Sequence, residues 1–458
     1  MRCVFRTYGL AIVLAVGVLC AAAGAEPSPA LRWTETPLGE LPQKLTPRQV
    51  CPSPDGTHAA YVLPLGWRNV VVLDGVQQDP YEWIVNCTVY FSADGRHTIY
   101  QARDRRFTFL VVDGKPLKPW ETIDDWAWTA DGEHLAYSAR RPDGRYMAVI
   151  DGAEGKAYPR VRLGAISGSG RVAVVATVEN GECLVLDGVE GKVYEHIFDV
   201  RFSADGKHVA GRALRGGKWR MLLDGAEGEM FDELRAPCFS PAGQRLGYVA
   251  LRDRAQYFVV DGVVSRPFQE ILMPSPVFST DSAHVACAGR VDDRWVILLD
   301  GAEKGAYAYV DPHMSFSPDG RLVYIARKGA SLRLIVAERE GTGHDAIPQV
   351  CFSPDGKRMA YIAVGDAGSS VILDGVAGKA YEQIDPRSLA FSPDGGHIAF
   401  SAERGKKWFV VVDGTESRPF DAIPLNGALS FDREGALNFI AVRDRQVLRV
   451  RAVPTSKP

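Results

Sequence analysis

The chain has 458 residues, and its 53 Lys and Arg against 56 Asp and Glu give a net charge of −3. The chain has no excess of positive charge, so the composition argues against a nucleic-acid partner. The 46 glycines indicate a chain that turns often, and beyond residue 25 no apolar run is long enough to span a membrane.

Residues 1–25 are predicted to be a secretory signal peptide. Arg2 and Arg6 precede an apolar run over Leu10–Ala23, and small residues up to Ala25 form a cleavage site. The run is short for a membrane anchor. We therefore expect the mature protein to be periplasmic or secreted, without a membrane span, and to begin with a loose polar lead-in over 26–38.

A short phrase repeats from Cys51 to the C-terminus. Its fullest form is Phe391-Ser392-Pro393-Asp394-Gly395, and the copies are spaced by about 36 to 40 residues. Proline presets φ and glycine closes a type I turn, so each copy predicts a turn between two strands. Full copies of the four-residue core stand at Ser53–Gly56, Ser317–Gly320, Ser353–Gly356 and Ser392–Gly395, with softened copies between them.

A second motif, Asp-Gly after an apolar run, recurs with the same spacing and predicts a hairpin in each unit. An aromatic residue follows seven positions after that Asp, as at Tyr81 and Phe420, and an apolar residue three positions further on. Each unit is therefore predicted to form four short strands, the last of them running through the Tyr-x-x-Ile segment. Such a sheet buries both faces only when it is stacked radially on its neighbours.

These repeats resemble the WD40-like β-propeller repeats of the TolB type, which show the same Phe-Ser-Pro-Asp-Gly turn before an Ile-Ala-Tyr strand. The resemblance covers nearly all of the chain after residue 40. It implies an all-β propeller and a periplasmic scaffold similar to the propeller half of TolB, although the N-terminal domain of that protein has no counterpart here. Propellers serve many unrelated functions, so the resemblance specifies the fold more than the role.

The two chain ends are predicted to complete one blade together. Gly39–Val50 aligns without a gap with Gly378–Leu389, so the N-terminus supplies an outer strand. The C-terminus stops after the strands Leu437–Ala441 and Val447–Arg451, before an outer strand of its own. Sharing the blade removes the free edge of an open sheet.

Ten complete units and one shared unit predict about eleven blades, whereas single rings typically hold roughly four to eight. The irregular connector Met273–Pro276 favours two packed rings, with blades in 39–277 and 278–458. One wide ring is the alternative. A second irregular place is repeat eight, where Glu338-Arg339-Glu340-Gly341 replaces the Asp-Gly hairpin.

Few residues offer catalytic or metal-binding chemistry. The aspartates of the repeated turn fall in different blades and are explained by turn geometry, so we expect no metal site and no cofactor. The six cysteines after residue 25 form no Cys-x-x-Cys pair, and Cys51, Cys238 and Cys351 at equivalent positions suggest buried free thiols. The histidines that follow the turn recur at one repeat position, which suggests packing or solvated side chains: His58, His97, His134, His208, His284 and His397.

The hairpins between the second and third strands carry basic and aromatic residues. Strand alternation puts these hairpins on one rim, which is either a solvated rim of mixed charge or a recognition face, since Arg and Trp are enriched where binding energy concentrates. The candidate binding residues are Arg105, Arg106, Arg140, Arg141, Lys218, Trp219, Arg254, Arg294, Trp295, Lys407 and Trp408.

We expect a non-enzymatic, exported propeller that acts as a protein-binding scaffold of the cell envelope, its partner being an envelope protein or a cell-wall component. No catalytic residue is predicted, and the chain is filled by repeats that leave no room for a hydrolase domain. One alternative is a carbohydrate-active or other hydrolytic propeller, which needs two channel carboxylates with perturbed pKa values. Another is a lectin-like glycan binder that uses the rim tryptophans.

Overall fold

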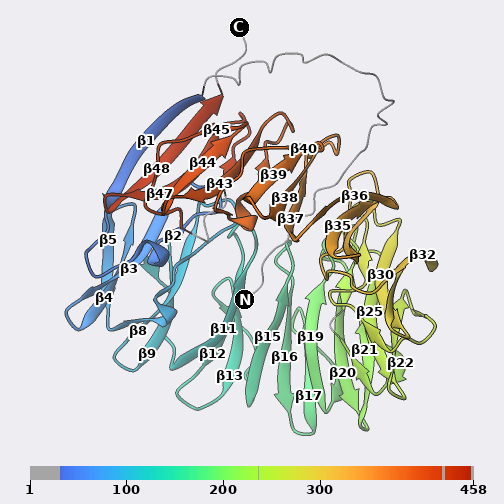
Figure 1. The fold of residues 1–458 in the computed structure, drawn as a ribbon. Coiled ribbons are helices and arrows are strands. Elements are labelled where there is room, and N and C mark those ends of the chain that lie inside the picture. Colours follow the sequence, from blue (N-terminus) through green and yellow to red (C-terminus); the bar gives the residue numbers. More distant parts are fainter. Residues whose placement is uncertain (1–30, 236, 425–428, 455–458) are drawn as a thin grey trace.

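The computed structural model describes residues 31–235, 237–424 and 429–454, so the predicted signal peptide lies outside the described residues. These residues form eleven antiparallel sheets arranged as the blades of one ring, numbered here from Cys51 onward (Figure 1). The predicted all-β propeller of about eleven four-stranded repeats is confirmed, with the innermost strand split into two segments in blades 2, 6, 7 and 10. Within the described ranges no helix is both long and apolar enough to cross a membrane.

Blades 1 to 4 follow one another along the chain. Blade 1 comprises β2 (Cys51–Pro52), β3 (Ala59–Leu65), β4 (Arg68–Leu73) and β5 (Val76–Tyr81). Blade 2 comprises β6 (Trp83–Ile84), β7 (Tyr90–Phe91), β8 (Thr98–Asp104), β9 (Phe107–Val112) and β10 (Lys115–Pro116). Blade 3 comprises β11 (Thr122–Trp128), β12 (Leu135–Arg140), β13 (Tyr146–Ile150) and β14 (Ala153–Glu154). Blade 4 comprises β15 (Arg160–Ile166), β16 (Val172–Val178), β17 (Gly181–Leu186) and β18 (Val189–Tyr194).

Blades 5 to 8 continue the pattern. Blade 5 comprises β19 (His196–Phe202), β20 (Val209–Arg215), β21 (Lys218–Leu223) and β22 (Ala226–Phe231). Blade 6 comprises β23 (Glu233–Leu234), β24 (Cys238–Phe239), β25 (Leu246–Arg252), β26 (Ala255–Val260) and β27 (Val263–Val264). Blade 7 comprises β28 (Glu270–Ile271), β29 (Val277–Phe278), β30 (Val285–Val291), β31 (Arg294–Leu299) and β32 (Ala302–Tyr307). Blade 8 comprises β33 (Ser315–Phe316), β34 (Leu322–Lys328), β35 (Ser331–Val336) and β36 (Arg339–His344).

Blades 9 to 11 complete the ring. Blade 9 comprises β37 (Ala346–Phe352), β38 (Met359–Gly365), β39 (Gly368–Leu373) and β40 (Val376–Ala377). Blade 10 comprises β41 (Gln383–Ile384), β42 (Ala390–Phe391), β43 (Ile398–Arg404), β44 (Lys407–Val412) and β45 (Thr415–Glu416). Blade 11 comprises β46 (Ser430–Phe431), β47 (Leu437–Arg443), β48 (Gln446–Pro454) and β1 (Leu31–Glu40). Three 3₁₀ turns are present among the described residues: η1 (Pro47–Gln49) before blade 1, η2 (Val85–Cys87) between β6 and β7, and η3 (Pro386–Ser388) between β41 and β42.

The first strand of each blade faces the ring axis and the fourth lies outside. First strands of neighbouring blades contact one another, as β11 does β15 and β15 does β19. The Tyr-x-x-Ile segment is divided between blades, which differs from the prediction: Tyr194 ends β18, whereas Ile197 already belongs to the first strand of blade 5. The aromatic and the aliphatic residue thereby pack into the same interface between blades.

Both chain ends build blade 11, as predicted. Strand β1 pairs antiparallel with β48 along its length, from Leu31 opposite Pro454 to Glu40 opposite Gln446. The predicted loose lead-in over 26–38 is wrong from residue 31 onward, because that stretch is part of β1. The alignment of residues 39–50 with 378–389 holds in three dimensions, since Leu45 and Val50 are buried as Ile384 and Leu389 are.

The core consists of apolar clusters between successive blades, one at every interface around the ring. The cluster between blades 6 and 7 contains Val249, Phe268 and Ile271, so packing continues across the Met273–Pro276 connector. The cluster between blades 11 and 1 contains Leu41, Tyr61 and Ile440. The structure is therefore one wide ring, and the predicted preference for two packed rings is not confirmed.

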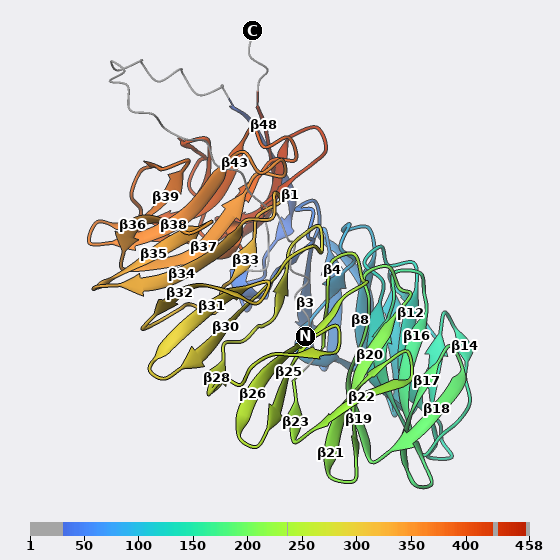
Figure 2. The ribbon, with the colours of Figure 1, turned by 90° about the vertical axis from the view of Figure 1, so that its right-hand side faces the viewer.

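The ring is not flat. Figure 2 shows the orange blades 8 to 11 and the cyan-to-green blades 3 to 6 tilted in different directions. Blade 8 keeps its outer hairpin despite its irregular sequence, because Ala337 and Glu338 adopt the left-handed conformation with φ of 46° and 67°. Elsewhere Asp and Gly occupy these two positions, as at Asp74 with φ 49° and Gly75 with φ 80°.

Candidate functional site

The ring has two rims of different chemistry. The Ser-Pro-Asp-Gly turns and the Asp-Gly hairpins lie on one side, which we call the turn rim. The hairpins between second and third strands and the connectors between blades lie on the other side, which we call the arginine rim. This division follows from the alternating direction of the four strands in each blade.

All predicted binding residues lie on the arginine rim, but the ring separates them. Each pair of strands meets there in a tight hairpin, such as the one closed by Asp104 opposite Phe107. The residues fall into three groups: Arg105, Arg106, Arg140 and Arg141 on blades 2 and 3; Lys218, Trp219, Arg254, Arg294 and Trp295 on blades 5 to 7; and Lys407 and Trp408 on blade 10. They are not one continuous site.

Several of these cations already have acidic or carbonyl partners nearby. Lys218 pairs with Asp232 and Lys407 with Asp421, and each carboxyl is held below its usual pKa chiefly by the hydrogen bond from that lysine. Arg140 lies 3.6 Å from Glu121, Arg141 lies 3.8 Å from Asp143, and Arg294 donates to the Ala306 carbonyl at 2.5 Å. In the part of the chain that the structure describes, the side chains of Arg105, Arg106 and Arg254 have no ion pair.

The predicted tryptophans act mainly in packing. Trp219, Trp295 and Trp408 are half-buried against the clusters between blades. Trp219 also lies under the Arg212 guanidinium, 4.9 Å from its ring centre. A half-buried indole has little free surface to offer a ligand.

The two most exposed aromatic side chains of this rim lie on blades 1 and 2 and were not predicted. Trp67 at the tip of the β3–β4 hairpin is 72% exposed, and Trp83 at the start of β6 is 54% exposed. The signal was available in the sequence, because Gly66-Trp67 occupies the same hairpin tip as Arg105-Arg106 one repeat later.

These tryptophans and the neighbouring arginines form one surface. Trp83 lies directly opposite Arg103 on β8, and the Arg105 backbone N–H donates to Glu82 Oε2 at 2.7 Å. Arg68 joins the two hairpin tips, 3.1 Å from Asp104. We call this surface the blade 1–2 patch, and its members are Leu65, Trp67, Trp83, Arg103, Arg105 and Arg106.

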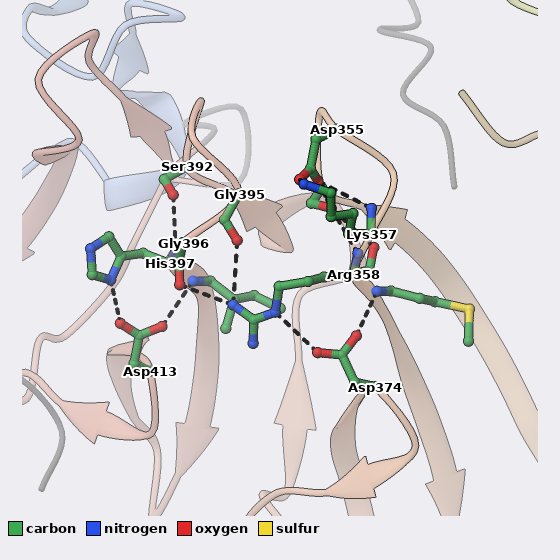
Figure 3. A network of polar contacts seen from close by, with 12 residues as sticks. Asp355, Lys357, Arg358, Asp374, Ser392, Gly395, Gly396, His397 and Asp413 are labelled. Carbon is green, nitrogen blue, oxygen red and sulfur yellow. Dashed lines mark hydrogen bonds and ion pairs between the residues drawn. The ribbon is translucent and has the colours of Figure 1, made fainter. Parts of the chain in front are cut away.

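The turn rim carries a repeated polar network. Figure 3 shows it at blades 9 and 10, where Arg358 bonds Asp374 at 3.0 Å and reaches the Gly396 carbonyl of the next turn at 2.9 Å. His397 Nδ1 lies 2.6 Å from Asp413 Oδ2. The six histidines predicted as packing or solvated residues thus have a further role, each bonding the Asp of its own blade's outer hairpin.

The turn aspartates serve turn geometry, as predicted. Asp394 accepts from Ser392 Oγ at 2.5 Å and from the Gly396 N–H at 2.9 Å. Among the described residues no three His, Cys, Asp or Glu side chains are grouped as a metal would require. Hydrogen bonds of the same kind lower the pKa of Asp205 and of Asp355 to about 2, so both carboxyls are ionised at neutral pH.

The six described cysteines are free thiols, as predicted, but they are not all buried. Burial raises the pKa of Cys51 and Cys238, and that of Cys351 to about 11, which makes these thiols unreactive. Cys87 departs from the prediction because it is exposed, in the left-handed end of η2.

No family model matches the sequence, and no curated protein resembles it significantly. Solved structures with partial similarity include a eukaryotic initiation factor, 12% identical with a TM-score of 0.41, covering 80% of this chain and 96% of that one. The propeller of Dos1 is 12% identical with a TM-score of 0.31, covering 60% and 89%. The β-propeller domain of the trilobed protease from Pyrococcus furiosus is 12% identical with a TM-score of 0.28, covering 64% and 94%.

These similarities say nothing about a ligand or an activity. The propeller fold implied by the resemblance to TolB-type repeats is present in the structure, whereas membership of that repeat family stays a prediction.

Proposed function

We propose that the protein is an exported, non-enzymatic binding module that serves as a protein-binding scaffold in the cell envelope, and that the blade 1–2 patch is its docking surface. The observation that carries the proposal is the exposure of Trp67 and Trp83 near Arg105 and Arg106, which form no ion pair with any described residue. Export rests on the signal peptide predicted over residues 1–25.

The composition of the patch favours a protein partner of particular chemistry. Tryptophan and arginine are the residues most enriched among those that dominate binding energy, and an exposed indole is costly to leave in water. Arg105 and Arg106 attract carboxylates. We therefore expect the partner to present acidic side chains around an apolar or aromatic one, which would pack between Trp67 and Trp83.

The test is capture of envelope proteins by the immobilised chain, residues 26–458, in parallel with Trp67→Ala/Trp83→Ala and Arg105→Glu/Arg106→Glu. We expect a partner that the wild type retains and that each double variant loses about tenfold or more, as for residues central to an interface. High salt should weaken its retention, because exposed charges are screened.

Val189→Ala is the matched control, since Val189 is also 72% exposed but lies on the outer strand of blade 4. It should retain the same partner as the wild type. Capture of identical proteins by all four forms, or of none, would contradict the proposal.

A lectin-like glycan binder is the second candidate, favoured by the same two exposed indoles. A glycan array probed with the wild type and with Trp67→Ala/Trp83→Ala separates the two candidates. Saturable glycan binding that is lost in the double variant would support the glycan binder over the protein-binding scaffold.

A further inference from the structure

A cavity of about 430 Å³ opens between blade 11 and blade 1, in the blade that both chain ends build. It is lined by Arg32, Thr34 and Thr36 of β1, by Arg449 and Arg451 of β48, and by Asn438 of β47. Thr57, in the first turn of blade 1, forms the opposite wall. The cavity has no part in the docking surface proposed above.

Strand alternation explains why these side chains meet. Residues two apart on a strand face the same side, so Arg32, Thr34 and Thr36 share one face of β1. Thr34 lies opposite Arg451 and Thr36 opposite Arg449, which brings both strands' polar residues together.

The residues between them face the other way. Trp33 packs edge-on against Phe439, 6.4 Å between ring centres, and Glu35 binds Arg443 at 2.6 Å. One face of the closing blade therefore completes the core, and the other lines the cavity.

The charges of the cavity are only partly compensated. Arg451 bonds Asp432 at 2.8 Å and Glu434 at 3.2 Å. Asp55 is engaged by the Thr57 hydroxyl at 2.6 Å and by Ser53. Arg32 and Arg449 form no ion pair and no side-chain hydrogen bond within the described ranges, and neither do the Thr34 and Thr36 hydroxyls.

On the outer side of other blades, lysines pair with an acid of the next blade. Lys156 of one blade meets Glu190 of the next at 2.6 Å, and Lys379 meets Glu416 at 2.6 Å. In the cleft between blades 11 and 1, by contrast, the Arg32 and Arg449 guanidinium groups have no acidic partner among the described residues. A guanidinium presents a planar fork of N–H donors that matches phosphate and carboxylate oxygens.

We propose that this cavity binds a small anion bearing a phosphate-type group, held by the Arg32 and Arg449 guanidinium groups and by the Thr34 and Thr36 hydroxyls. Two cations and two hydroxyls suit a doubly charged tetrahedral oxyanion with several acceptor oxygens. The volume lies within the range of small-molecule sites and exceeds that of a single phosphate, so it has room for a second phosphate or an organic part of the ligand.

Calorimetric titration of residues 26–458 with pyrophosphate and with glycerol 3-phosphate tests the proposal. We expect saturable binding at one site, weakened about tenfold by Arg449→Ala, as loss of a charge-assisted hydrogen bond predicts. Arg160→Ala is the matched control, because Arg160 is an exposed arginine on the opposite rim, in blade 4, that forms no ion pair within the described residues, and it should leave the affinity unchanged.

Thr34→Val/Thr36→Val should also weaken binding, although it removes no charge. Such a loss distinguishes a specific site with hydroxyl donors from general attraction to a basic surface. Vesicles of phosphatidylcholine with and without phosphatidic acid reveal whether the phosphate belongs to a lipid. Binding of the soluble phosphates or of the acidic vesicles that Arg449→Ala weakens supports the proposal. No saturable binding to either, or equal binding by wild type and Arg449→Ala, overturns it.

Discussion

At the scale of single residues, the aspartate of the outer hairpin is bonded by a histidine in some blades and by an arginine in others. His58 bonds Asp74 at 2.6 Å, whereas at the equivalent position of blade 4 Arg171 bonds Asp187 at 2.9 Å. Histidine loses its charge near neutral pH and arginine does not. The hydrogen bond to the aspartate is the largest cause of the raised pKa of His58, His97 and His134.

This chemistry predicts a pH-dependent stability. A raised pKa in the folded state means that the pairs stabilise fully below the unfolded value of about 6.5, and that the stabilisation is lost as pH rises through the folded pKa. We expect the urea midpoint of the wild type to fall between pH 6 and 8, and to fall less when His58, His97 and His134 are replaced by Arg. An equal fall in both proteins would contradict the assignment.

Residue chemistry could be predicted from the sequence where it is local. The turn aspartates and glycines follow from turn geometry within four residues. The His–Asp bonds join positions 16 or 17 residues apart, and only the paired strands bring them together. Trp219 is half-buried because the neighbouring blade packs against it. The hairpin sequence contains no sign of that contact, and therefore suggested a recognition residue.

At the scale of the element, many turns of the repeat lie against the preceding blade, as those of Gly95 and Gly206 do. Gly56 has φ of 71°, and a Cβ there would lie 2.4 Å from the Asn438 carbonyl oxygen of blade 11. The outer hairpin of blade 3 is different, because Gly152 has φ of 82° but no atom within 4 Å of an added Cβ.

The two glycines give a matched pair of substitutions. We expect Gly152→Ala to cost about 1 kcal/mol of unfolding free energy, from the left-handed backbone alone. Gly56→Ala adds a clash with backbone that has little room to move, so we expect about 3 kcal/mol. Urea unfolding of both variants measures the difference, and equal costs would show that the turn does not bear on blade 11.

The element boundaries were predicted unevenly. The register of residues 39–50 was found by alignment with another repeat. The strand before it was not, because Leu31–Leu38 has no turn signal and its outer face is polar, which suggested a loose lead-in. That polar face is the lining of the anion cavity.

At the scale of the whole molecule, the number of blades was predictable and their arrangement was not. Each repeat contributes one blade, so counting repeats yields eleven. Whether eleven blades form one ring or two depends on the small tilt between neighbours, which accumulates around the ring and is set by side-chain packing. The connector Met273–Pro276 is irregular, but Val249, Phe258 and Cys287 pack across it.

The most direct test of the closure of the propeller is a disulfide between the two chain ends. Glu40 and Gln446 are exposed and directly opposite each other on β1 and β48. Paired positions in antiparallel strands lie about 4.5 to 5.5 Å apart between Cα atoms, within reach of a disulfide. In Glu40→Cys/Gln446→Cys we expect a tryptic peptide that links the two positions after mild oxidation, and none in either single variant. Thiols that both remain free to alkylating reagents would mean that the ends do not meet, and that the propeller is not closed as described.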